Sequence, residues 1–321
     1  MSQSQMQNFN KYFMPATIET LEQKVELFNA ASGGAITLTT QGFNGDFLQN
    51  SFFAAIHSAQ RRVDRYATNA SVAPTDLTQL KESGVKVAGG FGPIRYEPSQ
   101  MSWLNHPTKT GVEVASRNFA EAMLKDQLNT AIAAAVAAIG NQAAAVNNVS
   151  ASTGLSYAAI NGGHSKYGDA SSLLTTDVMS GAALHALIGQ NIQNPAQLFA
   201  AGNVRIVDIL GKLIVVTDAP ALFEAGTPGK HKVLSLSSQG IVVYDGSDVN
   251  SNIQTSNGKE RIETTMQVDY TFGLSLKGYS WDEANGGKSP TNAKLETGTN
   301  WLKVATDIKH TAGALTIAQA A

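Results

Sequence analysis

Two β-rich segments lie close together in Ala201-Gly-Asn-Val-Arg-Ile-Val-Asp-Ile-Leu-Gly-Lys-Leu-Ile-Val-Val-Thr-Asp-Ala-Pro-Ala-Leu-Phe223. Residues 204–207 and 212–216 are rich in valine and isoleucine, which favour extended backbone because branched side chains pack well on a pleated surface. Ala219-Pro220 ends the second segment, since proline cannot donate a hydrogen bond to a neighbouring strand. The stretch therefore predicts two strands, and the sequence on either side decides what surrounds them.

A long helix precedes these strands. Apolar residues recur every three or four positions from 112 to 146, the spacing of one face of an α-helix. Alanine supplies high helix propensity, and Gly140 is an expected weak point or kink. At about 1.5 Å per residue, the run predicts a helix about 50 Å long, enough to span a subunit. Its apolar positions are Val112, Ala115, Phe119, Met123, Leu124, Leu128, Ile132, Val136, Ile139, Ala143 and Val146.

The rest of the pattern predicts a second helix and then more strands. Residues 177–188 have helical spacing, with Gly189 near the expected end. Apolar residues alternate from 264 to 276, which predicts a long strand with one covered face. Residues 233–236 and 240–244 are also β-rich. Because helices precede a strand-rich half and do not alternate with strands, the sequence predicts an α+β fold.

The composition limits the classes of function. The chain has 321 residues, enough for one or two domains, of which 43% are hydrophobic and only 15% charged. Such a low charge density predicts that partners cover much of the surface. The formal net charge of −2 disfavours strong nucleic-acid binding, which needs basic side chains to neutralise phosphates. Cysteine is absent, which excludes disulfides, thiolate nucleophiles and cysteine metal sites.

From the N-terminal sequence we expect no export by a signal peptide, and from the whole sequence no membrane span. The N-terminal sequence lacks the basic start and apolar stretch of a signal peptide, and the chain has no run of about 18 apolar residues that would predict a membrane span. The first dozen residues, rich in Gln and Asn, predict an arm that becomes ordered only against something else. A short helix follows from Pro15, with Ile18, Leu21, Val25 and Phe28 on one face, and Ser32-Gly33-Gly34 ends it.

The segment from 66 to 111 is punctuated by glycine and proline around two strand-like pieces, 85–87 and 94–96. Short strands with so many turn residues bury little of themselves, so the segment is expected to project as a two-stranded extension. A lone hairpin is marginal in water, which predicts a partner that covers it. Just before it, Arg61-Arg62-Val63-Asp64-Arg65 fits either a solvated helix face or a contact with a neighbouring subunit.

Candidate catalytic motifs are weak. Gly84-Val-Lys-Val-Ala-Gly-Gly-Phe-Gly92 lacks the Gly-Lys-Ser/Thr ending and following helix of a phosphate loop, so a structural turn is expected. His164, Ser165 and Asp169 have the residue types of a hydrolase. However, neighbours in sequence rarely face one reacting atom, and no nucleophile-elbow motif occurs. An exposed polar loop is expected there instead.

Metal and stacking sites are equally weak. Asp245, Asp248 and Asn250 lack the glycine and glutamate of a calcium loop, so a β-turn is expected. His185 is expected to be a packing residue of its helix and not a metal ligand. Tryptophans are expected to be core or interface anchors. The six histidines lack the spacing that would place two of them on one metal ion; they are His57, His106, His164, His185, His231 and His310. The three tryptophans are Trp103, Trp281 and Trp301.

Several segments, in order along the chain, resemble the major capsid protein of tailed double-stranded DNA bacteriophages. They are 201–223 with its Val215-Val-Thr-Asp218 end, the helical run 112–146, and Asp76-Leu-Thr-Gln-Leu80, Val85-Lys-Val-Ala88, Glu97-Pro-Ser-Gln100, Asn129-Thr-Ala-Ile-Ala-Ala-Ala-Val-Ala-Ala-Ile139 and Lys277-Gly-Tyr-Ser-Trp-Asp-Glu-Ala-Asn-Gly-Gly-Lys-Ser-Pro290. The resemblance implies the HK97-like capsid fold of this coat protein family. It implies an N-terminal arm and short helix (1–55), an extended β-hairpin loop (56–111), a peripheral domain with a spine helix (112–176), an axial domain (177–258), and a return strand to the peripheral domain with a C-terminal segment (259–321).

The implied function is structural. Copies of the chain would self-assemble into pentamers and hexamers of an icosahedral phage head around double-stranded DNA, in the virion, after assembly in the cytoplasm of the bacterial host. No enzymatic activity, catalytic residue, cofactor or metal is expected. Expected partners are other copies of the chain, a separate scaffolding protein and a portal, with non-specific contact to packaged DNA and none to membrane. Whether a decoration protein binds stays open.

Two alternatives remain at the level of sequence. An encapsulin-like compartment would share the fold but enclose an enzyme. A small hydrolase or ligand-binding protein would be a low-mass oligomer with a polar pocket. Some members of the family cross-link lysine to asparagine, but Lys81 and Lys86 lie in no motif that identifies such a pair.

Overall fold

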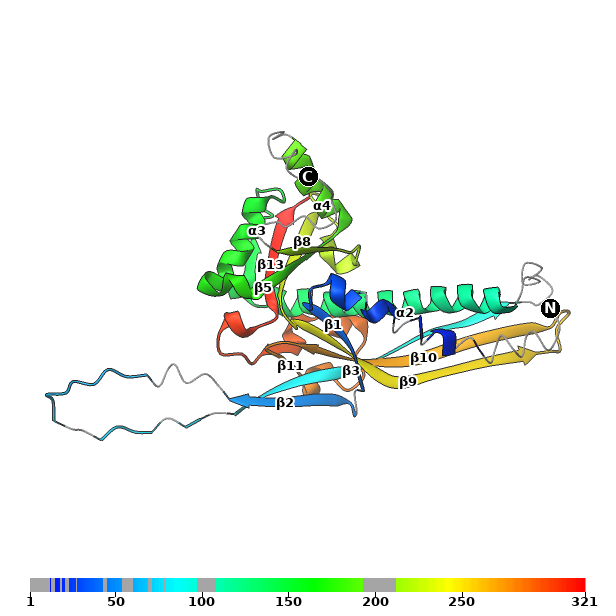
Figure 1. Ribbon diagram of the computed structural model, residues 1–321, viewed down its shortest axis with the longest axis horizontal. Helices are drawn as coiled ribbons and strands as arrows, with labels where there is room; N and C mark the ends of the chain where they lie inside the picture. Colours follow the sequence, from blue (N-terminus) through cyan, green and yellow to red (C-terminus); the bar gives the residue numbers. More distant parts are fainter. Residues whose placement is uncertain are drawn as a thin grey trace.

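The computed structural model describes residues 12, 15–17, 19–20, 23–26, 28–42, 45–53, 60–68, 71–74, 76–77, 79–96, 108–192 and 212–320. An upper lobe stands on a long, flat lower part, and a loop projects from one end of that lower part (Figure 1). The C-terminus lies in the upper lobe. Helices and sheets mix in both parts, which confirms the α+β prediction.

The helix α2 (Thr108–Gly140) is the longest element of the described chain, with 33 residues. At the standard rise it is about 50 Å long, and it runs along the lower part of the molecule (Figure 1). Apolar side chains of the predicted face are buried, which confirms the helix and its orientation. They include Phe119, Met123, Ile132, Val136 and Ile139.

The end of α2 differs from the prediction. The helix stops at Gly140, and Gln142 already has an extended backbone, so Gly140 is a terminus and not a kink. The predicted last turns instead form a 3-10 helix (Ala143–Ala145) and the strand β4 (Val146–Asn148). Val146 pairs with Leu315 in a sheet. A long-range backbone pairing has overridden the helical spacing of Ala143 and Val146.

A five-stranded sheet forms the lower part, in the order β1-β9-β10-β3-β2. All neighbours are antiparallel except β1 and β9. Alternate residues of β10 from Val268 to Leu276 are buried and contribute to the main core, as the alternating pattern predicts. The strands are β1 (Ile36–Gly42), β2 (Phe47–Phe53), β3 (Gln79–Tyr96), β9 (Ile241–Ser256) and β10 (Glu263–Leu276).

The strand β3 corrects the prediction of a two-stranded extension at 85–96. Residues 79–96 are one strand of 18 residues, which pairs with β2 from Gln79 to Val85 and with β10 from Val85 to Tyr96. Its glycines mark close approach and not turns: a Cβ on Gly89 would lie 2.9 Å from the ring of Tyr270, its cross-strand partner. A Cβ on Gly84 would lie 2.8 Å from the carbonyl oxygen of Leu274. The phosphate-loop candidate is therefore strand, and the expected turn is wrong.

The upper lobe contains a second sheet, in the order β4-β13-β8-β5-β6, with β7 paired to β8. Helices α3 (Tyr157–His164) and α4 (Gly181–Ile192) pack on it. Its strands β6 and β8 confirm the predictions at 212–216 and 233–236, whereas 204–207 lies outside the described residues. The strand bounds are β5 (Leu174–Met179), β6 (Leu213–Val216), β7 (Phe223–Glu224), β8 (Lys230–Ser237) and β13 (Gly313–Gln319).

The helix predicted at 177–188 begins too early. Residues 174–179 are the strand β5, and the helix starts at Gly181. The hydroxyl of Ser180 accepts a hydrogen bond from the backbone N–H of Ala183 at 3.2 Å, as an N-cap does. Asp177 and Val178 fit a helical face, but β5 pairs with both β6 and β8, so sheet formation determines their conformation.

Short elements complete the described chain. The described residues between 15 and 31 are helical and Ser32 begins a turn, in agreement with the predicted short helix. Ile18 and Leu21 lie outside the described residues. Trp281 and Trp301 are buried against each other, with ring centroids 4.9 Å apart, which confirms them as core anchors, while Trp103 lies outside the described residues. The remaining elements are β11 (Tyr279–Trp281), β12 (Trp301–Lys303), α6 (Glu283–Gly286), α7 (Asn292–Leu295) and 3-10 helices at Ser165–Leu173, Pro220–Leu222, Gly298–Asn300 and Ile308–His310.

Candidate assembly surfaces

The loop between β2 and β3 projects away from the body of the molecule (Figure 1). We call residues 54–78 the extended loop. Its described residues form neither helix nor strand, and they are exposed. Several are large and apolar: Val63 is 67% exposed, Tyr66 93%, Val72 56% and Leu77 56%. Exposed apolar side chains gathered on one segment are typical of a protein contact surface.

The arginines of the extended loop are solvent-exposed, and the helix face considered for them is wrong. Residues 60–64 have no regular structure, and a turn follows. The carboxylate of Asp64 accepts a hydrogen bond from the backbone N–H of Tyr66 at 2.9 Å, a local turn that aspartate commonly stabilises. Among the described residues, none forms an ion pair with Arg61, Arg62 or Arg65. The segment thus presents free guanidinium groups beside an exposed tyrosine ring.

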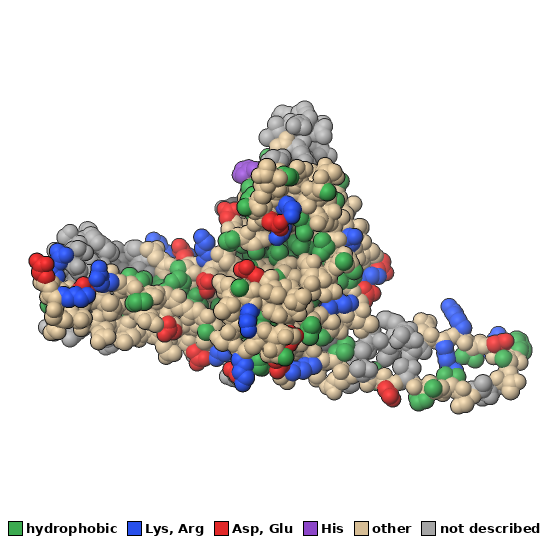
Figure 2. Space-filling model, turned by 180° about the vertical axis from the view of Figure 1, so that it is seen from behind, with side chains coloured by type: hydrophobic (Ala, Val, Ile, Leu, Met, Phe, Trp, Pro, Cys, Tyr) green, Lys and Arg blue, Asp and Glu red, His purple; other side chains and the backbone are tan. Residues whose placement is uncertain are grey.

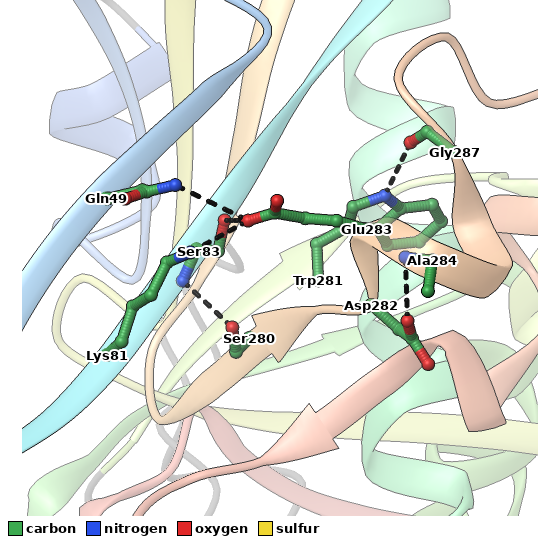
Figure 3. Close-up of polar contacts among 9 residues, drawn as sticks. All are labelled: Gln49, Lys81, Ser83, Ser280, Trp281, Asp282, Glu283, Ala284 and Gly287. Carbon is green, nitrogen blue, oxygen red and sulfur yellow. Dashed lines mark hydrogen bonds and ion pairs between the residues drawn. The ribbon is translucent and has the colours of Figure 1, made fainter.

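The base of the extended loop is held by one carboxylate. Glu283, at the start of α6, accepts hydrogen bonds from Lys81 at 2.9 Å, Ser83 at 3.3 Å and Gln49 at 3.4 Å (Figure 3). These three donors lie on β2 and β3, the two strands from which the loop emerges. Ser280 Oγ also accepts a bond from the backbone N–H of Ser83 at 3.1 Å. Glu283 therefore joins both strands of the hairpin to the body.

The segment that carries Glu283 is itself fixed. Asp282 caps α6, because its carboxylate accepts from the backbone N–H groups of Ala284 at 3.0 Å and Asn285 at 3.1 Å. The indole N–H of Trp281 donates to the carbonyl oxygen of Gly287 at 2.9 Å (Figure 3). A buried aromatic pair and a helix cap thus hold the carboxylate in place beside the hairpin.

A second carboxylate, that of Glu82, projects from the other face of β3. Side chains alternate along a strand, so Glu82 points away from Lys81 and Ser83. It accepts a hydrogen bond from the backbone N–H of Gly278 at 3.2 Å. Burial raises the pKa of Glu82, while the Gly278 bond and the charge of Lys277 oppose that rise. Both faces of β3 are therefore tied to the segment 277–287.

The far end of the lower sheet is charged. Glu263 pairs with Arg95 at 3.2 Å and with Lys259 at 2.7 Å, and the bond from Lys259 lowers the pKa of Glu263. Exposed Ile94 and Ile262 lie in the same region. These pairs bridge β3, β10 and the turn before β10 and leave apolar side chains beside them, as at the rim of an interface.

The calcium candidate lies in the same sheet. Asp245, Asp248 and Asn250 belong to β9, so the expected β-turn is wrong. Asp248 pairs with Lys86 at 2.5 Å, which lowers the pKa of Asp248. The register shifts between Asp245 and Val249, which is a bulge in the strand. Aspartate and glycine here mark that bulge.

The hydrolase candidate is dispersed. Ser165 donates to the carbonyl oxygen of Gly162 at 2.8 Å, and Asp169 pairs with Lys309. His164 is buried, contrary to the exposed loop predicted, and its Nε2 lies 2.9 Å from Oδ1 of Asp177. These three residue types do not converge on one reacting atom.

Other histidine predictions also change. His185 is exposed on α4, so the predicted packing role is wrong. His231 is buried on β8 beside the ring of Phe223, 5.5 Å away between centroids, and burial lowers the pKa of His231. Within the described residues, no three histidine, aspartate or glutamate side chains gather where they would hold a metal ion.

The sequence profile of the Gp13-like family, described as major capsid protein 13-like, matches residues 5–315. The chain belongs to this family of major capsid proteins. This Gp13-like major capsid protein is therefore a structural protein of the phage capsid, found in the virion. No curated protein compared with it is similar enough to count as a match.

Solved phage capsids share the fold of this Gp13-like protein. The cyanophage Pam1 capsid subunit has a TM-score of 0.55 and 12% identity over 89% of this chain and 88% of that one. The acid-stable capsid of Helicobacter pylori bacteriophage KHP30 has a TM-score of 0.50 and 8% identity over 90% of this chain and 89% of that one. These likenesses confirm the HK97-like capsid fold. Within the described residues, no helix is both long and apolar enough to cross a membrane.

The sequence did not reveal the residues that hold the extended loop. Glu283 lies within 277–290, one of the segments that resemble capsid proteins, yet it binds Lys81, 202 positions earlier in the chain. No periodicity or motif links positions so far apart. Glu82 has a partner 196 positions later, Gly278.

Proposed function

We propose that copies of this chain form pentamers and hexamers of an icosahedral head that encloses double-stranded DNA, and that the extended loop contacts a neighbouring copy. The observation that supports this is the exposed apolar surface of the loop: Tyr66 is 93% exposed and Val63 67%. The loop projects from the end of β2 and β3, away from the rest of its own subunit (Figure 1). These exposed apolar side chains would stabilise the assembly if a second surface removed them from water.

The division of labour within the subunit is also a proposal. Residues 1–55 would be the N-terminal arm and short helix, and 56–111 would form the β-hairpin loop of the family fold, which includes most of residues 54–78. Residues 112–176 would begin the peripheral domain, 177–258 would form the axial domain around the capsomer centre, and 259–321 would return to the peripheral domain. The upper sheet, which joins β5–β8 with β4 and β13, supports an axial lobe to which the last strand also contributes.

The charge of the chain fits a container wall. Its formal net charge is −2, so a shell of this chain would bind DNA weakly and without sequence preference. We infer a separate scaffolding protein, a portal and assembly in the host cytoplasm as the setting of this function, with no enzymatic role. Whether a decoration protein attaches stays open.

Expression of the chain with and without its scaffolding protein tests the proposal. Sedimentation and electron microscopy should show closed shells, and nuclease treatment of infectious particles should leave protected double-stranded DNA inside them. A variant with residues 60–77 replaced by a Gly-Ser linker of equal length should remain a folded subunit but form no shells. Shells of normal size and yield from this variant would contradict the role of the loop. Particles that contain an enzyme instead of DNA would favour a compartment shell.

Covalent cross-linking is a separate question. Within one chain, Lys81 and Lys86 each pair with a carboxylate, at 2.9 Å to Glu283 and 2.5 Å to Asp248, and no motif identifies an isopeptide pair. Boiled denaturing gels of mature particles decide the question. A monomer band alone excludes cross-linking, and a ladder of higher masses shows it.

A further inference from the structure

Asparagine is followed directly by glycine at four places in the chain: Asn44-Gly45, Asn161-Gly162, Asn257-Gly258 and Asn285-Gly286. Asparagine is one of the chemically least durable residues, because its side-chain amide can be lost as ammonia. The reaction is easiest before glycine, which has no side chain to shield its backbone nitrogen and adopts most backbone conformations. Asn44 lies outside the described residues, so the structure allows a comparison of the other three pairs.

The pair Asn257-Gly258 lies in the turn between β9 and β10, at the end of the lower part of the molecule (Figure 1). Residues 257–262 are exposed and belong to neither strand. Gly258 has a φ of 94°, in the left-handed region, and a Cβ placed on it would meet no atom within 4 Å. Among the described residues, none forms a hydrogen bond with the backbone N–H of Gly258 or the side-chain amide of Asn257. Both groups that would react are therefore accessible.

The pair Asn161-Gly162 lies within the helix α3. In an α-helix, each N–H beyond the first turn donates to the carbonyl oxygen four residues earlier, so the nitrogen of Gly162 is engaged and its backbone is fixed. Gly162 also packs closely, since a Cβ on it would lie 2.6 Å from Nδ2 of Asn147. The side chain of Asn161 is exposed, as is that of Asn257. Backbone conformation, and not exposure, therefore distinguishes the two pairs.

The pair Asn285-Gly286 is held by hydrogen bonds at the start of α6. Nδ2 of Asn285 donates to Oδ2 of Asp282 at 2.6 Å, and the backbone N–H of Gly286 donates to the carbonyl oxygen of Asp282 at 2.8 Å. Gly286 is buried, and a Cβ on it would overlap the indole ring of Trp281. The amide and the backbone nitrogen are thus both occupied, so the cap that orders α6 also protects this asparagine.

We propose that Asn257 is a site of spontaneous covalent modification, at which the backbone nitrogen of Gly258 converts asparagine into a mixture of aspartate and isoaspartate. The nitrogen forms a bond to the side-chain carbonyl carbon of Asn257, and its proton leaves with the amide nitrogen as ammonia. Water then opens the resulting cyclic imide. Cleavage at the side-chain carbonyl gives aspartate, and cleavage at the main-chain carbonyl gives isoaspartate, in which the main chain runs through the side chain.

The modification would change the charge and the shape of this end of the sheet. Figure 2 shows acidic and basic side chains gathered there. Lys259 pairs with Glu263 at 2.7 Å, and a carboxylate at position 257 would compete with Glu263 for that ammonium group. Each modified chain would be one unit more negative than the formal −2. Isoaspartate would also lengthen the main chain of the turn that joins β9 to β10.

Incubation of the folded full-length subunit at mildly alkaline pH, followed by mass spectrometry of its peptides, tests the assignment. The peptide with Asn257 should gain the mass that replaces an amide by a carboxyl group at least tenfold faster, roughly, than the peptides with Asn161 and Asn285. Isoaspartate should be part of the product, because only the cyclic imide yields it. Asn257→Asp supplies the chromatographic reference for the aspartate product.

The same chain in denaturant is the matched control. There the three asparagines should react at similar rates, because folding no longer protects two of them. Gly258→Ala should slow the reaction of Asn257 about tenfold in the folded subunit, since a methyl group now shields the attacking nitrogen. The reactions of Asn161 and Asn285 should not change in this variant.

Several results would overturn the assignment. They are equal rates at the three asparagines of the folded subunit, a reaction at Asn257 that occurs only in denaturant, and loss of the amide without isoaspartate. Circular dichroism before and after incubation sets the temperature at which the subunit stays folded, so that protection and unfolding are measured separately.

Discussion

The upper lobe and the extended loop differ in how far their side chains are buried. In the lobe, even polar groups are enclosed: Asp177 is fully buried, and its partner His164 is 3% exposed. In the loop, Tyr66 is 93% exposed and Val63 67%. The lobe satisfies its side chains within one chain, whereas the loop requires a surface that another molecule supplies. The difference locates where the subunit folds and where it assembles.

The largest effect is expected from a substitution that creates a cavity in the core of the subunit. Trp301→Ala removes a fully buried ring that packs against Trp281, so the free energy of unfolding of the unassembled subunit should fall by about 3–5 kcal/mol. Chemical denaturation measures this loss. Trp301→Phe keeps most of the volume and should lose less. A small loss in Trp301→Ala would show that this part of the body is loosely packed.

The buried hydrogen bond between His164 and Asp177 in the lobe should have the next effect. His164→Ala leaves the carboxylate of Asp177 buried without its partner, which should cost about 3 kcal/mol of unfolding free energy. His185→Ala, an exposed residue on the neighbouring helix, is the matched control and should change stability by less than about 0.5 kcal/mol. Equal losses in both variants would contradict the contrast between enclosed and exposed groups.

The anchor of the loop should have a smaller thermodynamic effect. Glu283→Ala removes the bonds to Lys81, Ser83 and Gln49, yet Lys81 is 50% exposed and Glu283 38%, so stability should fall by about 1 kcal/mol or less. Amide hydrogen exchange in β2 and the start of β3 should nevertheless accelerate, because the hairpin loses its attachment. Glu283→Gln keeps one acceptor oxygen and should exchange more slowly than the alanine variant. Unchanged exchange in both would remove the role of Glu283.

The carboxylate on the opposite face of β3 should change the pH dependence. Burial raises the pKa of Glu82 above its usual value of 4.5, so the folded state favours the protonated form. Its contribution to stability is complete below the unfolded pKa and is lost as pH rises through the folded pKa. The unfolding free energy of Glu82→Gln minus that of wild type should therefore be larger at pH 7 than at pH 4. Denaturation at both pH values measures this difference, and the reverse order would contradict it.

Substitution at the loop tip should have the smallest effect on the isolated subunit. Tyr66→Ser removes a ring that is almost fully exposed, so the unfolding free energy should change by less than about 0.5 kcal/mol. Shell yield should still decrease, because the contact surface is lost. A large loss of stability would show that the ring packs on its own chain.

Local patterns in the sequence predicted much of the fold. The three-to-four spacing before residue 140 predicted α2, and the alternation from Met266 to Leu276 predicted β10. In both cases the buried face depends on spacing along the chain, which a sequence displays directly. The predictions failed where a distant strand decided the conformation, as at Val146 and Asp177. There, backbone pairing outweighed a helical pattern.

The candidate surface was harder to predict. The sequence indicated an extended segment before α2, but assigned its strands to 85–87 and 94–96, because the glycines of β3 look like turn residues. Only the position of Tyr270 across the sheet shows why glycine is needed at 89. A groove of about 540 Å³ is lined by Ala133, Glu224, Glu296 and Leu315, which come from α2, β7, the segment after α7 and β13, and no local pattern joins them.

By itself, the sequence determined the class of this protein: an α+β capsid subunit with a long helix, a long strand and no catalytic motif. Periodicity and residue type are local properties, and they depend only on neighbours within a few positions. The tertiary structure decided which glycines lie under a ring, which carboxylate holds the loop and which acids share a groove. Those contacts join residues more than 200 positions apart, such as Lys81 and Glu283 with a separation of 202, and only the folded chain brings them within hydrogen-bond distance.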